Sequence, residues 1–331
     1  MKAAVHEPVL VADIGGTNAR FALAASGAEG RPQIQSVHEF AVTQFNSLAE
    51  AMAHYLAHVG APSPQRAVIA VASPITGDEI KLSNNPWSFS IQALQRQVGL
   101  AGIRVINDFA AIGMAIPHLA SEDLRLVGDA PAPASLEAAD RHYAVLGPGT
   151  GLGVCRVVLR QGRPLVMETE GGHIGFAPAD AYEVAVLHYL LRRYPRVSVE
   201  RLVSGPGLQN LHDAVCAIED RPCCARAPED ITACAQRGDD AVCSRAVELF
   251  CSILGGFAGD VVLLHGAWHG LYLGGGMTTR LLPWILGGAF RRRFEAKGRF
   301  HALMRTIPTQ AITHAQAGLL GAGACALEQS C

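Results

Sequence analysis

The sequence predicts an α/β protein with two related halves. Short apolar segments alternate along the chain with segments in which apolar residues recur at helical spacing, as in α/β domains. An apolar strand that ends in a glycine-rich turn occurs near residue 9 and again near residue 143, which is an internal repeat. The chain has 331 residues, enough for two domains that each have a core.

Composition and charge exclude several classes of protein. Hydrophobic residues make up 50% of the chain and charged residues 17%, as in globular rather than disordered proteins. The formal net charge of -2 provides no electrostatic reason for a nucleic-acid or acidic-lipid partner. We expect no run that approaches the ~20 apolar residues of a membrane span. We also expect no signal peptide in Met1–Pro8, and therefore a cytoplasmic protein without a membrane partner.

The first glycine-rich turn is a candidate phosphate-binding site. We expect Val9–Ala12 and Phe21–Ala25 to be strands, and the segment Asp13–Asn18 to join them. Glycine adopts a positive φ without cost and lets backbone N–H groups approach an anion, so Gly15 and Gly16 suit this role. Asp13 stands where a hydrated divalent cation could be held. A Walker loop is excluded because no lysine follows, but an ordinary hairpin turn remains an alternative.

The second glycine-rich turn repeats this plan without the acid. Tyr143–Gly153 contains an apolar strand and then glycines around Thr150, and a further strand is expected at Val154–Leu159. Only the first turn can therefore offer a carboxylate to a metal. Two such turns favour two related halves that face each other across a cleft.

The remaining elements follow from periodicity and capping signals. Helices are predicted at Leu48–Val59 behind a capping box that begins at Ser47, and at Ser90–Val98, Phe109–Met114, Glu183–Tyr194, Ser244–Leu264 and Gly318–Leu327. Strands are predicted at Ile34–Val42, Ala67–Ala72, Glu79–Leu82, Ile103–Ile106 and Leu271–Leu273. Pro117 marks a crossover between domains, and Ser121–Asp140 is expected to be a surface connection. The basic residues Arg291–Arg293 and Lys297 favour a solvated face over a phosphate site.

Polar residues at strand ends and in glycine-rich loops are candidates for a ligand site. Asn107 and Asp108 follow a strand at the edge where open α/β sheets bind ligands, and Asp108 is also a candidate helix cap. Two glycines separate Glu170 from His173, which favours a loop that brings both side chains to one ligand. A structural histidine, and a surface or helix-start acid at Glu200, remain the alternatives.

Two further patterns concern glycines and cysteines. Three consecutive glycines, Gly274–Gly276, follow a strand and allow a flat ring such as adenine to lie against bare backbone.

Six of the nine cysteines fall in one region, but no pair has the spacing of a structural zinc site, so reduced thiols are expected. These six are Cys216, Cys223, Cys224, Cys234, Cys243 and Cys251.

This combination of motifs resembles the bacterial ATP-dependent glucokinase family over almost the entire chain. The motifs are Asp13–Arg20, Pro74–Asp78, Ile106–Phe109, Gly149–Gly153, Glu170–His173, Ser204–Gly207 and Gly274–Gly276. The resemblance implies two ribonuclease H-like α/β domains, as in hexokinases and actin, that flank a cleft. Residues 1–117 with 312–331 would form the smaller domain, and residues 118–311 the larger.

The resemblance also implies an activity and a set of site residues. ATP would phosphorylate the 6-hydroxyl of glucose by in-line transfer, with Asp108 as general base. Glucose hydroxyls would bind to Asn107, Asp108, Glu170, His173 and Glu200. ATP would lie on Ala12, Asp13, Ile14, Gly15, Gly16, Thr17, Asn18, Gly149, Thr150, Gly274, Gly275 and Gly276, with Mg²⁺ near Asp13.

Several alternatives stay open at this point. The related repressor-kinase sugar kinases carry a cysteine-rich zinc loop where this chain has Gly175–Pro178, so that subfamily is disfavoured. Another hexose or an amino sugar could replace glucose. An actin-like or chaperone-like ATPase and a non-catalytic sugar sensor are the alternatives from other classes. A homodimer is usual among relatives of the family.

Overall fold

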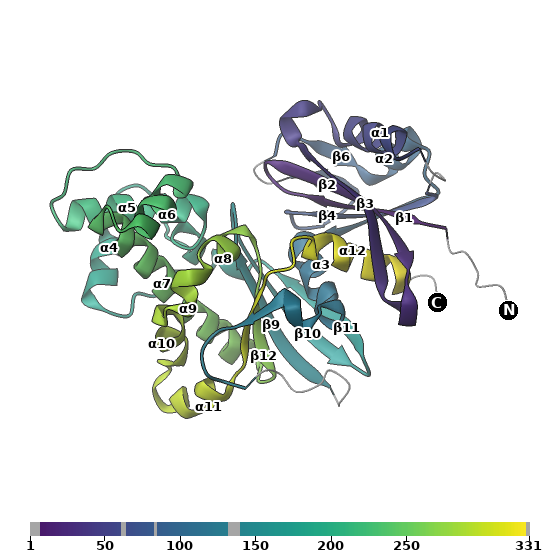
Figure 1. Cartoon of the computed structure of the whole chain (residues 1–331). Coiled ribbons are helices and arrows are strands. Elements are labelled where there is room, and N and C mark those ends of the chain that lie inside the picture. The colour runs from purple at the N-terminus through teal and green to yellow at the C-terminus, as the bar shows by residue number, and fades with distance from the viewer. Residues whose placement is uncertain (1–6, 61–63, 83–84, 132–139, 329–331) are drawn as a thin grey trace. The chain divides into compact units, whose positions relative to one another are not determined.

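The computed structural model describes residues 7–60, 64–82, 85–131 and 140–328. The chain forms two compact units, each described by itself (Figure 1). Unit 1 comprises Met1–Ala120, Pro164–Glu168 and His314–Cys331, and unit 2 comprises Ser121–Arg163 and Thr169–Thr313. Both contain strands and helices, so the α/β prediction is confirmed.

Unit 1 is built on a five-stranded sheet. The strand order is β3 (Pro32–Ala41), β2 (Asn18–Ser26), β1 (Val9–Ile14), β4 (Arg66–Val71) and β7 (Gly102–Asn107). The first three strands pair antiparallel, whereas β1, β4 and β7 run parallel. The parallel strands therefore end at one common edge, which carries the predicted ligand residues of this unit.

Helices cover both faces of this sheet (Figure 1). Leu10, Ala12 and Ile14 belong to a core with α1 (Leu48–Val59) and α2 (Ile91–Val98), whereas Val9 and Val11 pack with α3 (Asp108–Ala115) and α12 (Ala317–Glu328). Strand β1 therefore alternates between two cores, which explains why its sequence reads as a continuous apolar run. The short strands β5 (Glu79–Lys81) and β6 (Ser88–Ser90) form a separate hairpin.

Unit 2 repeats the same order of strands. The sheet to which its strands belong runs β11 (Arg163–Thr169), β10 (Leu152–Arg160), β9 (Arg141–Pro148), β12 (Gly270–Leu273), β13 (Thr309–Ile312) and β8 (Leu124–Leu126), and Pro164–Glu168 of β11 are the residues assigned to unit 1. As in unit 1, an antiparallel hairpin is followed by parallel strands, because β12 pairs parallel with both β9 and β13. The internal repeat that the two glycine turns predicted is therefore confirmed at the level of topology.

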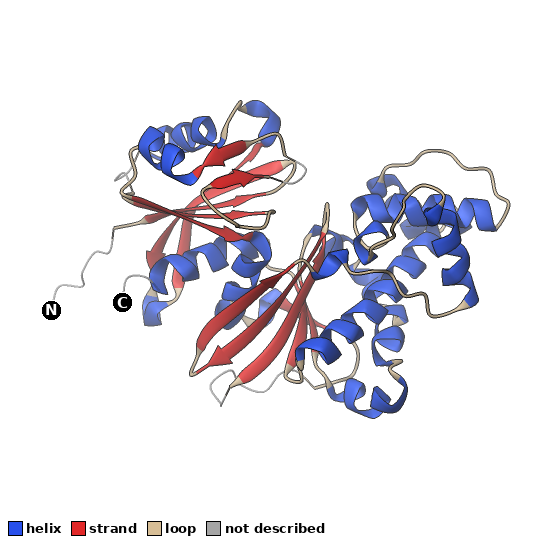
Figure 2. Cartoon of the chain, turned by 180° about the vertical axis from the view of Figure 1, so that it is seen from behind, coloured by secondary structure: helices blue, strands red, loops and turns tan. Residues whose placement is uncertain are grey.

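The helices of unit 2 gather beside its sheet (Figure 2). They are α4 (Ala181–Leu191), α5 (Gly205–Ile218), α6 (Pro228–Arg237), α7 (Ala241–His265), α8 (Gly276–Arg280), α9 (Leu282–Leu286), α10 (Ala289–Glu295) and α11 (His301–Thr306). Helix α7 packs against α5, α6 and α10.

Helix α7 corrects one expectation. It is long and apolar enough to cross a membrane, with a mean hydropathy of 1.8 in its most apolar window, so an apolar run of that length does exist. However, 72% of that window is buried, as expected for the core helix of a globular unit. Its apolar residues supply the centre of the unit 2 core, where a surface helix would need a polar face.

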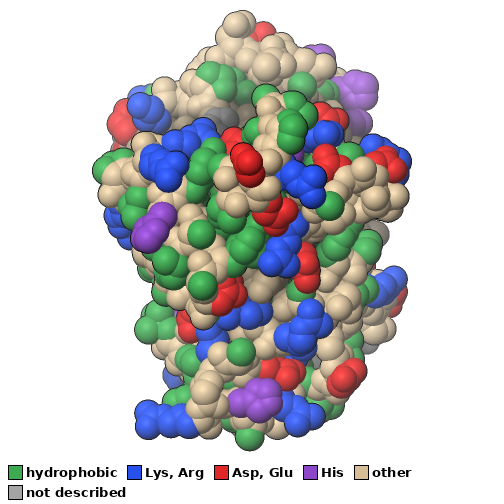
Figure 3. Space-filling view, turned by 90° about the vertical axis from the view of Figure 1, so that its left-hand side faces the viewer, with side chains coloured by type: hydrophobic (Ala, Val, Ile, Leu, Met, Phe, Trp, Pro, Cys, Tyr) green, Lys and Arg blue, Asp and Glu red, His purple; other side chains and the backbone are tan. Residues whose placement is uncertain are grey.

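The basic cluster is a second correction. Arg291 is only 6% exposed, and its guanidinium donates to the carbonyl oxygens of Met304, Arg305 and Ile307 and to the Thr309 hydroxyl. Lys297 pairs with Asp260 at 2.6 Å. These side chains hold elements of unit 2 together and do not form a solvated face. Figure 3 shows basic and acidic side chains interspersed on the face that it presents.

Four short or edge strands of the described residues were not predicted, and β6 is one of them. Strand β8 lies within Ser121–Asp140, which was expected to be only a surface connection and of which residues 132–139 lie outside the described part. Strands β11 and β13 also escaped prediction. In contrast, α1 begins and ends as predicted, with Ser47 accepting from the Glu50 N–H at 3.2 Å.

Candidate active site

The first glycine turn joins β1 to β2 in unit 1. The Gly15 N–H donates to the Asn18 carbonyl at 2.9 Å and closes the turn. Neither Gly15 nor Gly16 is among the described glycines with a positive φ, so that part of the expectation was wrong. The remaining reason for glycine here is the lack of a side chain, which keeps the backbone of the turn uncovered.

Two side chains that the sequence did not single out brace this turn. Asn85 donates its Nδ2 to the Gly15 carbonyl at 2.8 Å. Glu39 accepts from Asn18 Nδ2 at 2.6 Å and from Arg20 Nε at 2.8 Å. Glu39 lies on β3, where the strand register places it opposite Arg20, whereas Asn85 lies outside the named strands and helices and 70 positions along the chain from Gly15, so only the folded structure reveals its contact.

Asp13 lies at the carboxyl end of β1 in an environment that disfavours its charge. Burial raises the pKa of its carboxyl group above the ordinary 3.8, and Glu39 adds to the rise. Arg20 opposes the rise, but its nearest nitrogen is 3.7 Å from Asp13 Oδ2. A Cβ on Gly318, at the start of α12, would lie 2.6 Å from the same oxygen, so only glycine fits there. A half-buried, incompletely neutralised carboxylate of this kind is a hard oxygen ligand for a divalent cation.

Asn107 and Asp108 lie on the same edge of the unit 1 sheet. The strand register pairs Ile14 with Val71, and Val71 with Asn107. Since neighbouring strands are ~4.8 Å apart, the backbones of the first turn and Asn107 are separated by about 10 Å. This is a span that one phosphorylated sugar or phosphate chain can bridge.

The helix cap at this position is Asn107 and not Asp108, which corrects the prediction. Asn107 Oδ1 accepts from the backbone N–H groups of Phe109 at 2.8 Å and Ala110 at 3.2 Å. Asp108 is the first residue of α3 and accepts from the Phe109 N–H at 2.8 Å. Both side chains are half-buried, and the helix N-terminus orients the carboxylate of Asp108.

Unit 2 brings three predicted sugar ligands together. His173 Nε2 lies 4.0 Å from Glu170 Oε2 and 3.8 Å from Glu200 Oε1. The side chains of Glu170 and His173 are each 57% exposed, so they are accessible to a solute. His173 belongs to the short 3-10 turn Gly171–His173 after β11, and its exposed side chain disfavours the alternative of a structural histidine.

Glu200 also contacts the second glycine turn. Its Oε2 accepts from the Leu152 N–H at 2.8 Å, and a Cβ on Gly151 would lie 2.6 Å from the same oxygen. Glu200 lies in the first turn of the short 3-10 helix Val199–Arg201, so the helix-start alternative is confirmed, but its carboxylate also binds the backbone of the glycine turn. The contact joins the candidate sugar ligands to the candidate phosphate turn within one unit.

A helix N-terminus and the third glycine segment adjoin the same turn. Helix α5 begins at Gly205, whose N–H donates to the Gly149 carbonyl at 2.8 Å. Gly275 has φ 82°, and a Cβ there would lie 2.7 Å from the Pro148 carbonyl oxygen. Unit 2 thus gathers Gly149, Thr150 and Gly274–Gly276 at the carboxyl ends of β9 and β12, as expected for nucleotide ligands.

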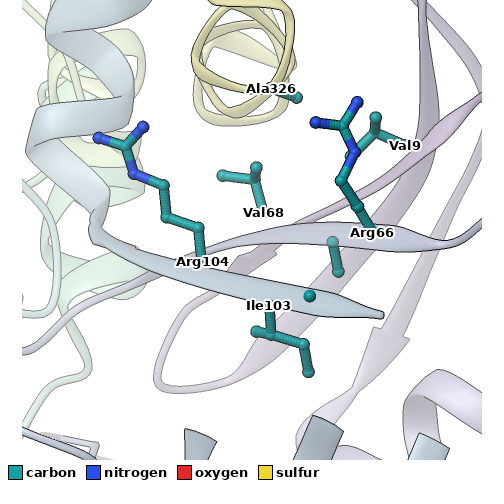
Figure 4. Close-up of a pocket in the computed structure, with 8 residues that line it drawn as sticks. Val9, Arg66, Val68, Ile103, Arg104 and Ala326 are labelled. Atoms are coloured by element: carbon teal, nitrogen blue, oxygen red, sulfur yellow. The ribbon is translucent and has the colours of Figure 1, made fainter. Parts of the chain in front are cut away.

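The cavities lie elsewhere in the two units. One of about 220 Å³ in unit 1 is lined by Arg66, Val68 and Arg104, whose side chains lie beside Ala326 of α12 (Figure 4). It opens at the amino ends of β4 and β7, opposite the edge that carries Asp108. A second, of about 260 Å³, is lined by Ile174, Arg293 and other residues of unit 2. Neither cavity is lined by the candidate ligands.

Two α/β units with repeated mixed sheets are the architecture of the hexokinase- and actin-like class of kinases and ATPases. The sequence profile of the family described as Glucokinase matches residues 10–329. The chain is 46% identical to the glucokinase of Stenotrophomonas maltophilia (strain R551-3) over 325 residues, which cover 98% of this chain and 96% of that protein. The chain therefore belongs to the glucokinase family.

Solved structures agree with this assignment. The chain resembles the crystal structure of a glucokinase from an Antarctic psychrotroph, with a TM-score of 0.83 and 36% identity over 98% of this chain and 99% of that one. The structure of a glucokinase from Balamuthia mandrillaris in complex with glucose matches this chain with a TM-score of 0.81 and 20% identity. The match covers 99% of this chain and 95% of that one. This second likeness supports the fold alone.

Proposed function

We propose that Asp108 is the general base through which this glucokinase transfers the γ-phosphoryl group of ATP to the 6-hydroxyl of glucose. Family membership makes the chain an ATP-dependent enzyme that phosphorylates glucose. Phosphoryl transfer passes through a loose transition state, so the hydroxyl proton leaves late and the enzyme mainly aligns the reactants. A carboxylate ordered by a helix N-terminus is suited both to aim the attacking oxygen and to receive that proton.

The proposed sugar ligands are Asn107 and Asp108 of unit 1 and Glu170, His173 and Glu200 of unit 2. The observation that carries this proposal is the cluster in which His173 lies within 4.0 Å of both glutamates. Carboxylates accept hydrogen bonds from adjacent sugar hydroxyls, and an imidazole donates or accepts according to its tautomer. Glu200 also holds the backbone of the second glycine turn, which couples sugar binding to the proposed phosphate site.

The proposed nucleotide ligands are the two glycine turns and Gly274–Gly276. The segment Ala12–Asn18 and the pair Gly149 and Thr150 offer uncovered backbone to phosphates, and α5 adds the positive end of its dipole beside Gly149. Asp13 fits a divalent cation because it is a half-buried carboxylate that Arg20 neutralises only in part. Mg²⁺ there would neutralise charge on the phosphates.

The proposal also concerns the organisation of the molecule. We assign residues 1–117 with 312–331 and residues 118–311 to two catalytic domains, so that one glucose contacts residues of both.

We further propose that the enzyme is cytoplasmic and that it forms a homodimer. Light scattering after size-exclusion chromatography tests the dimer. A monomer at micromolar concentration would contradict the dimer.

The test of function is a panel of hexoses incubated with the protein, ATP and Mg²⁺. We expect glucose-dependent ADP formation and glucose 6-phosphate as the product. ATP hydrolysis without any sugar would favour an actin-like ATPase, and sugar binding without turnover would favour a sensor. Faster turnover of mannose, fructose or an amino sugar than of glucose would correct the substrate.

A further inference from the structure

We propose that unit 2 binds one Zn²⁺ through His212, Cys216 and Cys223, at a site that plays no part in phosphoryl transfer. Ligand atoms of these three side chains all lie within 4.8 Å of one another. Two thiolates and an imidazole form a donor set that selects zinc among the common divalent metals. The sequence pattern did not predict this site, because no two of these residues have the spacing of a known structural zinc motif.

The local fold explains how the three ligands meet. His212 and Cys216 are four residues apart on α5, so they share one face of that helix. The chain turns back directly after α5, where the Arg221 N–H donates to the Cys216 carbonyl at 2.8 Å. This turn carries Cys223 to the end of the helix face. A metal bound here would fasten the irregular segment 219–227 to α5, beside α6 (Figure 1).

The surroundings favour a cation. The side chain of His212 is 3% exposed, yet its Nδ1 makes only a long contact of 3.4 Å with Asp213 Oδ1. The same carboxylate oxygen lies 3.5 Å from Cys223 Sγ, and so adds negative charge beside two of the three ligands. Arg193 pairs with the other oxygen of Asp213 at 3.4 Å. Cys216 is buried and Cys223 is exposed, so the ion would have a path of entry from solvent.

A neighbouring group of side chains provides an internal comparison. Cys234, Asp240 and Cys243 also lie within 4.8 Å of one another. Arg226 occupies that place, since its guanidinium lies 3.1 Å from Asp240 Oδ2 and 3.7 Å from Cys234 Sγ. Asp240 is also engaged as the cap of α7. A cation would have to displace the guanidinium, so we assign zinc only to the first group.

The experiment measures zinc bound to the full-length protein under reducing conditions. We expect one Zn²⁺ per chain by elemental analysis, and Co²⁺ in its place should produce the thiolate-to-metal absorption of a tetrahedral site. Cys223→Ser should weaken zinc binding by roughly 10²-fold or more in a chelator competition, since even groups outside the ligand shell contribute 10–100-fold. Cys224→Ser is the matched control, because Cys224 is also exposed and adjacent to Cys223 but lies outside the group.

Stability and activity provide independent readouts. Zn²⁺ should raise the melting temperature of the parent protein and of Cys224→Ser, but not that of Cys223→Ser. Glucose phosphorylation by Cys223→Ser should stay within two-fold of the parent, because Cys223 lies outside the proposed catalytic residues. Absence of stoichiometric zinc in the parent, or equal loss in both variants, would overturn the proposal. A Cys216–Cys223 disulfide in protein isolated with blocked thiols would instead assign a redox pair.

Discussion

At the scale of single residues, the carboxyl group of Asp13 combines burial with incomplete charge compensation. Its pKa is raised by burial, and Arg20 opposes this effect while also pairing with Glu39. Because the pKa is higher in the folded than in the unfolded protein, the contribution of this group to stability is present at low pH and is lost as the pH rises through the folded pKa. At neutral pH the charge of Asp13 therefore costs stability in the absence of a cation.

Asp13→Asn should consequently stabilise the ligand-free protein while abolishing turnover. We expect a higher melting temperature than the parent at pH 7, and a difference that shrinks as the pH falls toward the ordinary value of 3.8. Glucose affinity should change little, since the proposed cation serves the phosphates. Thermal melts across pH, together with calorimetric glucose titration, measure these effects. A lower melting temperature of the variant at pH 7 would show that Asp13 has a stabilising structural role.

The catalytic role of Asp108 and the helix-cap role of Asn107 can be distinguished by measuring both activity and stability of their variants. Asp108→Ala should lower kcat by roughly 10²–10⁴-fold, the usual range for general acid–base help, without changing ATP affinity. Its effect on stability should be small, about 0.3–1 kcal/mol, because it removes an acid from the first turn of α3 while the Phe109 N–H keeps Asn107 Oδ1 as an acceptor.

Asn107→Ala is the matched variant for the cap of α3. It should cost about 1 kcal/mol of unfolding free energy, because the side chain that accepts from Phe109 and Ala110 is lost. Urea unfolding and steady-state kinetics on both variants distinguish the roles. A kcat of Asp108→Ala within a few-fold of the parent would remove Asp108 from the mechanism.

At the scale of elements, backbone approach decides where glycine is required. Gly275 needs to be glycine for two reasons, its φ of 82° and the proximity of the Pro148 carbonyl. This contact holds the end of β12 against the end of β9, which carries the second glycine turn. Gly276 follows directly, yet a Cβ there would meet nothing within 4 Å.

Gly275→Ala should therefore destabilise the protein, whereas Gly276→Ala should not. We expect a loss of about 1–3 kcal/mol from backbone strain for the first variant, and a change within ~0.5 kcal/mol for the second. ATP affinity should fall in Gly275→Ala because the two glycine segments separate. Urea unfolding and nucleotide titration provide the measurements. Equal stability of the two variants would refute the role of this contact.

At the scale of the whole molecule, the proposed ligands of glucose are divided between two units with the same strand order. Asn107 and Asp108 come from unit 1, and Glu170, His173 and Glu200 come from unit 2. If one glucose engages both sets, as we propose, its binding would restrict the motion of one unit relative to the other. Such restriction couples sugar binding to exclusion of water, which suppresses wasteful hydrolysis of ATP.

Glucose should accordingly compact the protein and slow amide exchange near both Asn107 and Glu170. Amides at the amino ends of β4 and β7, around Arg66 and Gly102, should remain unchanged because they lie at the opposite edge of the sheet. Small-angle scattering and hydrogen exchange with saturating glucose measure both effects. Protection confined to one unit, with an unchanged radius of gyration, would contradict a site shared by the two.

The elements that local pattern predicted are those with local causes. Leu48–Val59 is a helix with the predicted limits because its cap, its apolar face and its terminal glycine are all encoded within a few residues. The internal repeat could be predicted because in each half of the chain a glycine-rich turn follows an apolar strand. Strands β8 and β13 have four residues or fewer, and their pairing partners are remote in sequence, so no local signal distinguishes them.

The sequence by itself determined the α/β class, the repeated glycine turns and the family, since these depend on residue type and spacing along the chain. Only the tertiary structure decided which polar groups meet. It joined Glu200 to Leu152 and buried Arg291 among five acceptors. It also made Asn107 the cap of α3 and brought His212, Cys216 and Cys223 together. The physical reason is that desolvation and hydrogen bonding depend on distances between remote segments, which the order of residues does not specify.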